Sequence, residues 1–263
     1  MKKNSLKKRR VRRRKKSIFS NFFFSFFLFF FIIFSSALGF LLFSPRFQIQ
    51  EMIISGNNNI STEDIEKIAT DKFKISFSFM GFNIDTESIF LSFGNKVNEI
   101  KEALPEIDRV SIKKNFPSGI SIEIIEKEPF AIWSFNEENY LVDKNGSFIK
   151  NFSDDEDYSR LIKINQKEEF NNINKKEILN SLDKIKLKLE EYSIGISSFD
   201  LFNDKTKANT DESFPIIFNL DQNLDWQIEK LVIVFEKNNY LDKLGEIEYI
   251  DLNYENQVVI KSN

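Results

Sequence analysis

The sequence predicts an α+β protein with a single N-terminal transmembrane helix, followed by two mixed units of helices and strands. Three observations lead to this prediction. Residues 18–43 carry no charge and include twelve phenylalanines. Later segments alternate apolar and polar residues, as strands do, or repeat apolar residues at steps of three and four, as helices do. The 263-residue chain has no cysteine or histidine, so its fold must rest on core burial rather than disulfides or Cys/His zinc sites.

A basic tail precedes the apolar stretch. Residues 1–17 hold eleven Lys or Arg and no acid, whereas only Arg46 lies close behind residue 43. A hydrocarbon core needs about 20 apolar residues as helix, so residues 18–43 are long enough to span it. Because Lys and Arg are enriched on the cytoplasmic side of membrane helices, we expect a cytoplasmic tail at 1–17 and a single-pass helix at 18–43. All residues after Ser44 should then lie outside the cytoplasm, on the far side of the membrane.

A cleaved signal peptide is the alternative, since a basic region, an apolar core and the small residues Ser35 and Ala37 are all present. The apolar stretch is longer than the usual signal core of about 7 to 15 residues. It also continues from Phe40 to Phe43, past the plausible cleavage point. These residues favour an uncut anchor.

Composition narrows the possible activities and partners. Without the tail, 26 basic residues stand against 40 acidic ones, a net charge of −14. We therefore expect no nucleic acid partner for the outer part, and the tail is better suited to the anionic lipid surface than to nucleic acid. A peptidoglycan-cleaving enzyme is the catalytic alternative, but the chain has no Gly-x-Ser-x-Gly and no glycine-rich phosphate loop. We expect no catalytic residues, cofactor, metal or small-molecule substrate.

The first outer unit is expected over residues 47–128. Residues 47–55 alternate as a strand that ends at Gly56, and Ser61 can cap a helix over about 62–70. A second helix is expected between 86 and 103. Residues 109–116 and 120–124 alternate around Pro117-Ser118-Gly119, which predicts a β-hairpin. The predicted order β-α-α-β-β gives a three-stranded sheet covered on one face by two helices.

These strings resemble a POTRA domain, specifically the one behind the membrane anchor of FtsQ/DivIB-type bacterial cell-division proteins. The resembling strings are SGNNNIS, the hairpin RVSIKKNFPSGISIEIIEKEP and the FAIW that follows it. The family commonly shows V-x-R-x-x-P and E-R-x-P-x-A here. Lys113 or Lys114 replaces the first arginine and Lys127 the second. Lysine keeps the charge but cannot make the bidentate pairs of arginine.

The second outer unit is expected over residues 130–263. Residues 140–142 and 148–149 read as strands around Asn145-Gly146. Acidic residues 154–157 predict a surface loop, and a helix from Lys175 should end near Gly195. Strands are expected at 199–202 and 214–220, then a helix around residues 225–235 and two closing strands at 246–252 and 257–261. This pattern predicts an antiparallel-rich sheet with covering helices.

Two further strings resemble the same family. YLVDKNG resembles the LVD-x-x-G that follows the POTRA domain, and IEYIDLNYENQVVI resembles the family's closing Val/Ile-Asp-Leu-Arg-Tyr string. Asn253 stands at the position of that arginine. The resemblance implies a second, FtsQ-like β domain.

Three features have competing interpretations. Trp133 and Trp226 could be partner anchors, although burial in the core is the expectation for each. The helix with Ile178, Leu182, Ile185, Leu189 and Tyr192 on one face could pair with a coiled coil, but we expect it to cover its own sheet.

The last strand is the candidate binding site. A terminal strand can leave one side of its backbone free to receive a partner's strand, although loops of the same chain could close that edge. In FtsQ the C-terminal strand region binds FtsB, which is paired with FtsL, so the resemblance implies FtsB- and FtsL-like partners here. It points to Tyr254 first, and the expected site comprises Tyr254, Asn256, Gln257, Val258, Val259 and Ile260.

The resemblance as a whole implies a non-enzymatic scaffold in the bacterial inner membrane, with periplasmic domains, that links division proteins at the septum. The alternative is a POTRA-type binding or chaperone module of a secretion or outer-membrane assembly system. No following β-barrel is evident in the sequence, which argues against a transporter.

Overall fold

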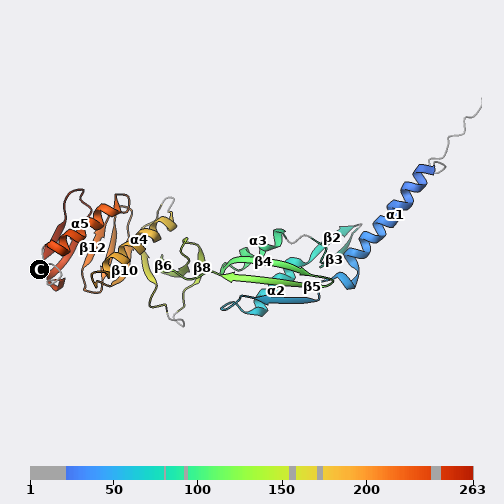
Figure 1. Ribbon diagram of the computed structural model, residues 1–263, viewed down its shortest axis with the longest axis horizontal. Coiled ribbons are helices and arrows are strands. Elements are labelled where there is room, and N and C mark those ends of the chain that lie inside the picture. Colours follow the sequence, from blue (N-terminus) through green and yellow to red (C-terminus); the bar gives the residue numbers. More distant parts are fainter. Residues whose placement is uncertain are drawn as a thin grey trace, which may run out of the picture.

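The structure is a computed structural model that describes residues 22–79, 81–91, 94–153, 158–170, 174–237 and 244–262. Its elements follow one another along the long axis, from helix α1 (Phe22–Phe43) at one end to the C-terminus at the other (Figure 1). Two separate sheets with covering helices lie after α1, so the predicted α+β class is confirmed. The basic tail, residues 18–21 and the predicted loop at 154–157 lie outside the described residues.

Helix α1 is uncharged over its 22 residues, and none of them is buried against the rest of the protein. It is long and apolar enough to cross a membrane, although a signal sequence would meet the same test. This helix is consistent with a single-pass anchor. A short 3₁₀ turn, η2 (Pro45–Phe47), leads from it into the body.

The first sheet has three strands in the order β1-β5-β4. Strand β1 (Glu51–Ser55) runs parallel to β5 (Gly119–Glu126), while β4 (Ile107–Asn115) forms the predicted antiparallel hairpin with β5. Helices α2 (Thr62–Phe73) and α3 (Gly94–Ala103) cover one face, and their apolar residues pack against the strands. The buried core of this part is Ile65, Ala69, Phe73, Ile100, Leu104, Ile107, Val110, Ile120, Ile122 and Ile124.

Helix α2 begins where the sequence predicts. The Ser61 hydroxyl accepts a hydrogen bond from the Asp64 amide at 3.1 Å, which satisfies one of the free donors of the first turn. Gly56 ends β1 with φ +84°, and a Cβ there would lie 2.1 Å from the Ile124 carbonyl oxygen. Glycine is therefore required both for the backbone angle and for the close approach of β5.

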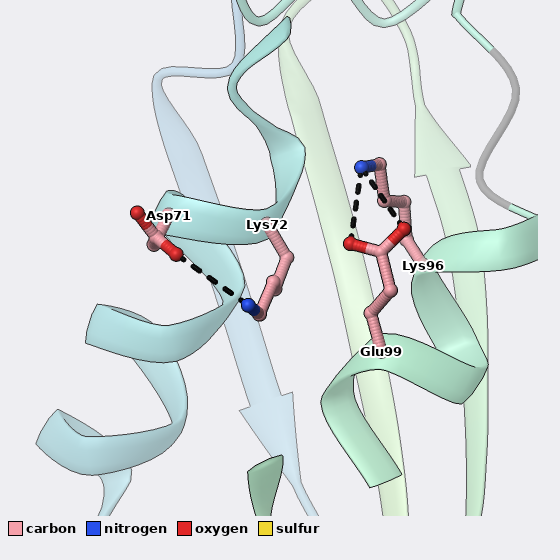
Figure 2. A network of polar contacts seen from close by, with 4 residues as sticks. All are labelled: Asp71, Lys72, Lys96 and Glu99. Carbon is pink, nitrogen blue, oxygen red and sulfur yellow. Dashed lines mark hydrogen bonds and ion pairs between the residues drawn. The ribbon is translucent and has the colours of Figure 1, made fainter. Parts of the chain in front are cut away.

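Figure 2 shows α2 and α3 lying over the strands of this sheet, with an ion pair on each helix. Lys72 lies 3.7 Å from Asp71, and Lys96 lies 3.2 Å from Glu99. Each pair stays within its own helix and keeps contact with solvent, and such pairs contribute only about 0.5 kcal/mol or less. Apolar burial, rather than these charges, therefore holds the two helices on the sheet.

The prediction for the segment between the helices was wrong in part. The expected helix over residues 86–103 begins only at Gly94, and a two-stranded ribbon precedes it. Strands β2 (Ile75–Phe79) and β3 (Phe82–Thr86) pair only with each other among the described residues. The alternation of aromatic and polar residues in ISFSF favours extended chain over helix, so this part of the POTRA order contains an additional hairpin.

The second sheet has nine strands in the order β14-β13-β12-β11-β10-β9-β6-β7-β8. Five of its eight strand pairs are antiparallel, as the predicted antiparallel-rich sheet requires. Its strands are β6 (Ala131–Phe135), β7 (Glu138–Val142), β8 (Phe148–Asn151), β9 (Ile162–Gln166), β10 (Ile196–Leu201), β11 (Thr206–Thr210), β12 (Pro215–Phe218), β13 (Ile247–Asp251) and β14 (Val259–Ser262). Strands β6, β9 and β11 were not predicted.

Helices α4 (Lys175–Glu190) and α5 (Leu224–Lys237) pack against this sheet and against each other. Leu179, Leu182, Ile185 and Leu189 of α4 are buried in the main core, which confirms that this helix covers its own sheet. Lys184 also pairs with Asp225 of α5. Both helices contribute to one apolar layer that includes Trp133, Phe199, Phe214, Phe218 and Phe235.

Gly195 does not end α4, contrary to the prediction. The helix ends at Glu190, and the left-handed residue after it is Ser193, with φ 62°. A Cβ on Gly195 would lie 2.1 Å from an Asp211 carboxylate oxygen. Gly195 therefore lies beside Asp211, whose backbone amide donates to the Gly195 carbonyl at 3.0 Å, rather than at the helix stop.

The two sheets are joined through the short link after β5. Lys127 donates a hydrogen bond from its Nζ to the Phe148 carbonyl oxygen at 2.9 Å, and this oxygen belongs to β8 of the second sheet. A cavity of about 660 Å³ lies beside this link, between α2 and β8. Its lining includes Lys67, Leu104, Ile149 and Tyr158.

Glu126 holds the asparagine-rich loop before α2. Its carboxylate accepts hydrogen bonds from the amides of Asn58, Asn59 and Ile60 at 2.7, 2.9 and 3.0 Å, and from the Asn59 side chain at 2.8 Å. Burial acts to raise the pKa of Glu126, but these hydrogen bonds outweigh it and hold the pKa below the ordinary 4.5. The stabilisation is therefore complete above pH 4.5 and is lost as the pH falls through the folded-state pKa.

We predict that Glu126→Gln destabilises the loop by about 1 kcal/mol at neutral pH, because water screens part of the charge. Amide hydrogen exchange over residues 57–61, followed by mass spectrometry, should be roughly fivefold faster. Glu123→Gln is the matched control, since Glu123 lies on the same strand and makes only an exposed ion pair with Lys113 at 3.6 Å. In acid below the folded-state pKa the difference between wild type and Glu126→Gln should vanish, and a difference that persists there contradicts the assignment.

Candidate partner-binding edge

Strand β14 forms one edge of the nine-stranded sheet, at the end of the protein farthest from α1 (Figure 1). It pairs with β13 in antiparallel register, with Ile250 opposite Ile260 and Asp251 opposite Val259. No strand of the described residues lies on its other side. The last strand therefore has an open backbone edge.

The direction of the backbone groups follows from the neighbouring strand. The Leu252 amide donates to the Ile217 carbonyl of β12 at 2.9 Å, so the amide of Asp251, one residue earlier, faces β14. Asp251 and Val259 are then a hydrogen-bonded pair, whereas Ile250 and Ile260 are not. The amide and carbonyl of Ile260 therefore point away from β13, and by the same alternation those of Val258 do too.

The side chains of this segment divide between two faces. Val258 and Ile260 are partly buried and pack against the main core. Lys261, on the other face, donates to Glu248 at 2.8 Å and lies over the Tyr249 ring at 6.0 Å. The hydrogen bond to Glu248, with the attraction between the charges, raises the pKa of Lys261. The core contacts of Val258 and Ile260 fix the strand while their backbone groups stay exposed.

A buried lysine holds the connection between β13 and β14. Lys230 of α5 is 6% exposed, and its Nζ donates to the carbonyls of Leu252 at 2.9 Å, Tyr254 at 2.5 Å and Gln257 at 3.4 Å. Burial lowers the pKa of Lys230, and the nearby Asp251 charge partly offsets this. An ammonium group has three donors, and here each of them has a backbone carbonyl as its partner.

Trp226 lies beside the same connection. Its indole nitrogen donates to the Glu255 carbonyl at 2.8 Å, and the residue is 39% exposed, so the expectation that it is buried was wrong. Trp133 is fully buried, as expected, and its indole nitrogen donates to Gln166 at 2.9 Å. With Glu255 and Asn256, Trp226 borders a cavity of about 440 Å³ at the end of the sheet.

The expected site residues lie together in this region. Tyr254, Asn256 and Gln257 are exposed in the connection, and Tyr254 as a residue is 52% exposed. Val258 lies just before β14, while Val259 and Ile260 lie in it. Sequence reasoning considered Trp226 as a partner anchor but expected it to be buried, and it missed the part played by Lys230. The one signal for Lys230 in the sequence is its position between the apolar Ile228 and Leu231 of a helix. That position does not identify the carbonyls that Lys230 binds.

The described residues offer no metal centre here. No group of three or more His, Cys, Asp or Glu among them could hold an ion. The features of this edge are exposed backbone groups, an exposed tyrosine and tryptophan, and a rigid support, which suit the binding of a peptide strand.

Several curated proteins are similar to parts of this chain. Cell division protein DivIB of Staphylococcus aureus (strain NCTC 8325 / PS 47) is 28% identical over 113 residues, which is 43% of this chain and 23% of that protein. Cell division protein FtsQ of Bartonella bacilliformis is 29% identical over 107 residues, covering 40% and 30% of the two chains. FtsQ of Rickettsia typhi is 26% identical over 121 residues, covering 45% and 39%. The match thus spans less than two fifths of the length of these relatives.

Two family models match successive parts of the chain. Residues 47–127 match the FtsQ-type POTRA domain, and residues 131–253 match the C-terminal part of cell division protein FtsQ/DivIB. The second match ends one residue before Tyr254. Because both models describe the same kind of protein, in the same order, the chain belongs to the FtsQ/DivIB family of non-enzymatic cell-division proteins.

Proposed function

We propose that this chain is a scaffold of the bacterial division machinery that acts by recruitment and is anchored in the inner membrane by α1. Family membership supports the role in division, and the length and composition of α1 support the anchor. The eleven basic residues in 1–17, against a net charge of −14 for the remainder, support a cytoplasmic tail and a periplasmic body. In this proposal the protein is concentrated at the division septum.

The body would act as two domains in series, a POTRA domain over residues 47–128 and an FtsQ-like β domain over residues 130–263. The first would localise the protein among division components that arrive earlier. The second would hold a pair of small membrane partners of the FtsB and FtsL type, and so couple wall synthesis at the septum to constriction. The resemblance to FtsQ/DivIB proteins is the basis of both roles.

The observation that carries the proposed binding mode is the open edge of β14. A strand added beside β14 can pair with the outward amide and carbonyl groups of Val258 and Ile260. The exposed side chains of Tyr254, Asn256 and Gln257 would meet the partner next to that strand, and Trp226 lies close enough to join them. Backbone pairing would supply affinity, while these side chains would supply selectivity.

The hydrogen bonds from Lys230 favour the binding of a partner at this edge, because they keep the segment before β14 ordered. Three carbonyls of the connection before β14 are already bound, so the strand does not need to become ordered when a partner arrives. Binding to an ordered surface avoids the loss of conformational entropy that a flexible segment would suffer. A POTRA-type chaperone module of a secretion system remains the alternative, but no described contact favours it.

Depletion of the protein tests the function as a whole. Cells that lose a division scaffold continue to grow without septation, so we expect long filaments, measured as cell length by microscopy, and recovery when the wild-type chain is supplied. Normal division after depletion would refute the role in septation.

We predict that Val258→Pro weakens partner binding about tenfold, because proline removes an outward donor from the edge without removing a hydrogen bond to β13. Val258→Ala is the matched control, since it loses the same side-chain contacts but keeps the amide. The measurement is co-purification of the membrane partners with full-length protein in detergent, followed by titration. Equal affinity for the two variants rules out strand addition at β14, and recovery of barrel or secretion proteins instead supports the alternative function.

Tyr254→Ala should weaken the same binding by roughly 5- to 30-fold, the usual range for an aromatic anchor at the centre of an interface. Leu187→Ala is the control, because Leu187 is an exposed apolar residue of the same domain but lies on α4, outside this edge. Tyr254 is exposed, so thermal unfolding of both variants should match wild type. Unchanged affinity of Tyr254→Ala would place the binding centre elsewhere.

A further inference from the structure

The β2–β3 ribbon has one apolar face and one polar face. Its register pairs Phe77 with Ile84 and Ser78 with Asn83. Because side chains alternate along a strand, Ile75, Phe77, Phe82 and Ile84 share one face with Thr86. Ser76, Ser78, Asn83 and Asp85 share the other face, where Asp85 binds Ser76 at 2.6 Å and Lys74 at 2.8 Å.

The apolar face is open in the described structure. Phe82 is 73% exposed, Ile84 43% and Phe77 40%. A two-stranded ribbon is at best marginally stable in water, and one that exposes its aromatic face lacks the burial that usually supports a sheet. The composition of this face therefore requires an apolar environment that the chain itself does not supply among its described residues.

The ribbon is fixed to the end of α1. The Phe77 ring lies 6.3 Å from that of Phe43, the last residue of the helix. The Thr86 hydroxyl and the Gln48 side-chain amide both donate to the Leu42 carbonyl, and the Ser88 hydroxyl donates to the Leu41 carbonyl at 2.9 Å. The last carbonyls of a helix have no partner within it. Thr86 at the base of the ribbon and Ser88 just after it supply those partners together with Gln48, which follows η2, and so fix the ribbon beside α1.

A row of aromatic rings extends from the same end of α1. Phe40 contacts Phe47 at 5.9 Å, Phe47 contacts Phe90 at 5.1 Å, and Phe90 contacts Phe116 in the β4–β5 turn at 5.6 Å. Phe90 and Phe116 are exposed. The exposed rings named here, all in residues 47–128, are therefore gathered in two places, and each group is linked by ring contacts to the C-terminal turn of α1.

We propose that the apolar face of the β2–β3 ribbon, through Phe77, Phe82 and Ile84, lies in the interface of the same bilayer that α1 spans. This inference rests on the membrane anchor of the proposed function. The argument is continuity: Phe77 contacts a residue of the helix, so lipids that surround this end of α1 also reach the ribbon. The polar face, with its ion pair, then turns to water, which is the arrangement of an interfacial amphipathic element.

The absence of cysteine allows a direct test with the full-length protein. Single cysteines at Phe82→Cys, Asn83→Cys, Leu38→Cys and Phe148→Cys can each carry one environment-sensitive fluorophore. The protein is placed in vesicles of phosphatidylethanolamine and phosphatidylglycerol that contain a lipid with a nitroxide near the headgroup. Position 38 reports on α1, position 82 on the apolar face, and position 83 on the polar face of the same strand. Position 148 is an exposed aromatic site on β8, in the second sheet.

Strong quenching is expected at positions 38 and 82, with quenching at 82 about threefold greater than at 83 and absent at 148, because an interfacial element buries only one face. Quenching at 38 combined with none at 82 overturns the inference and leaves the anchor intact, and a protein partner would then have to cover the ribbon. Equal quenching at 82 and 83 also overturns it, since the label itself would explain the insertion. If position 38 is not quenched, the anchor fails and the inference fails with it.

Discussion

Backbone groups without a partner in their own helix or strand are the constraint on which this structure depends. Among the described residues, such groups include the last carbonyls of α1, the amides of the asparagine-rich loop, and the carbonyls between β13 and β14. In each place, side chains that lie elsewhere in the sequence supply the missing hydrogen bonds. They are Gln48, Thr86 and Ser88 at α1, Glu126 at the loop, and Lys230 at the connection. Because an unpaired buried polar group is costly, these few contacts fix segments that the apolar cores do not cover.

The outer edge of β14 is the contrasting case. Its amide and carbonyl groups alternate toward and away from β13, and those of Val258 and Ile260 have no neighbouring strand among the described residues. Core packing of Val258 and Ile260 holds β14 in place. Lys230 and Trp226 hold the connection that precedes it. An edge that is both ordered and unpaired is suited to a partner's strand, and the FtsQ/DivIB family to which the chain belongs is one of division proteins.

Local patterns carried most of the fold prediction. The period of two in 109–124 identified the β4–β5 hairpin, and the steps of three and four after Lys175 identified the buried face of α4. The β2–β3 ribbon was missed although ISFSF alternates clearly, because the aromatic residues that follow obscured the start of α3. The support of the β14 edge by Lys230 could not be predicted in this way. The partners of Lys230 are carbonyls 22 to 27 residues away, and only the order of strands in the sheet brings them to it.

The distance between α1 and β14 has a consequence for any protein that binds there. The two domains lie in series, so the last strand is carried to the end of the molecule opposite the helix (Figure 1). A partner rooted in the same bilayer can reach it only through a stalk about as long as both domains together. A long helical stalk meets that requirement at a rise of about 1.5 Å per residue, whereas a small protein held close to the lipid surface does not. The length of the body would thereby select any partner at β14 by its reach before any side chain is recognised.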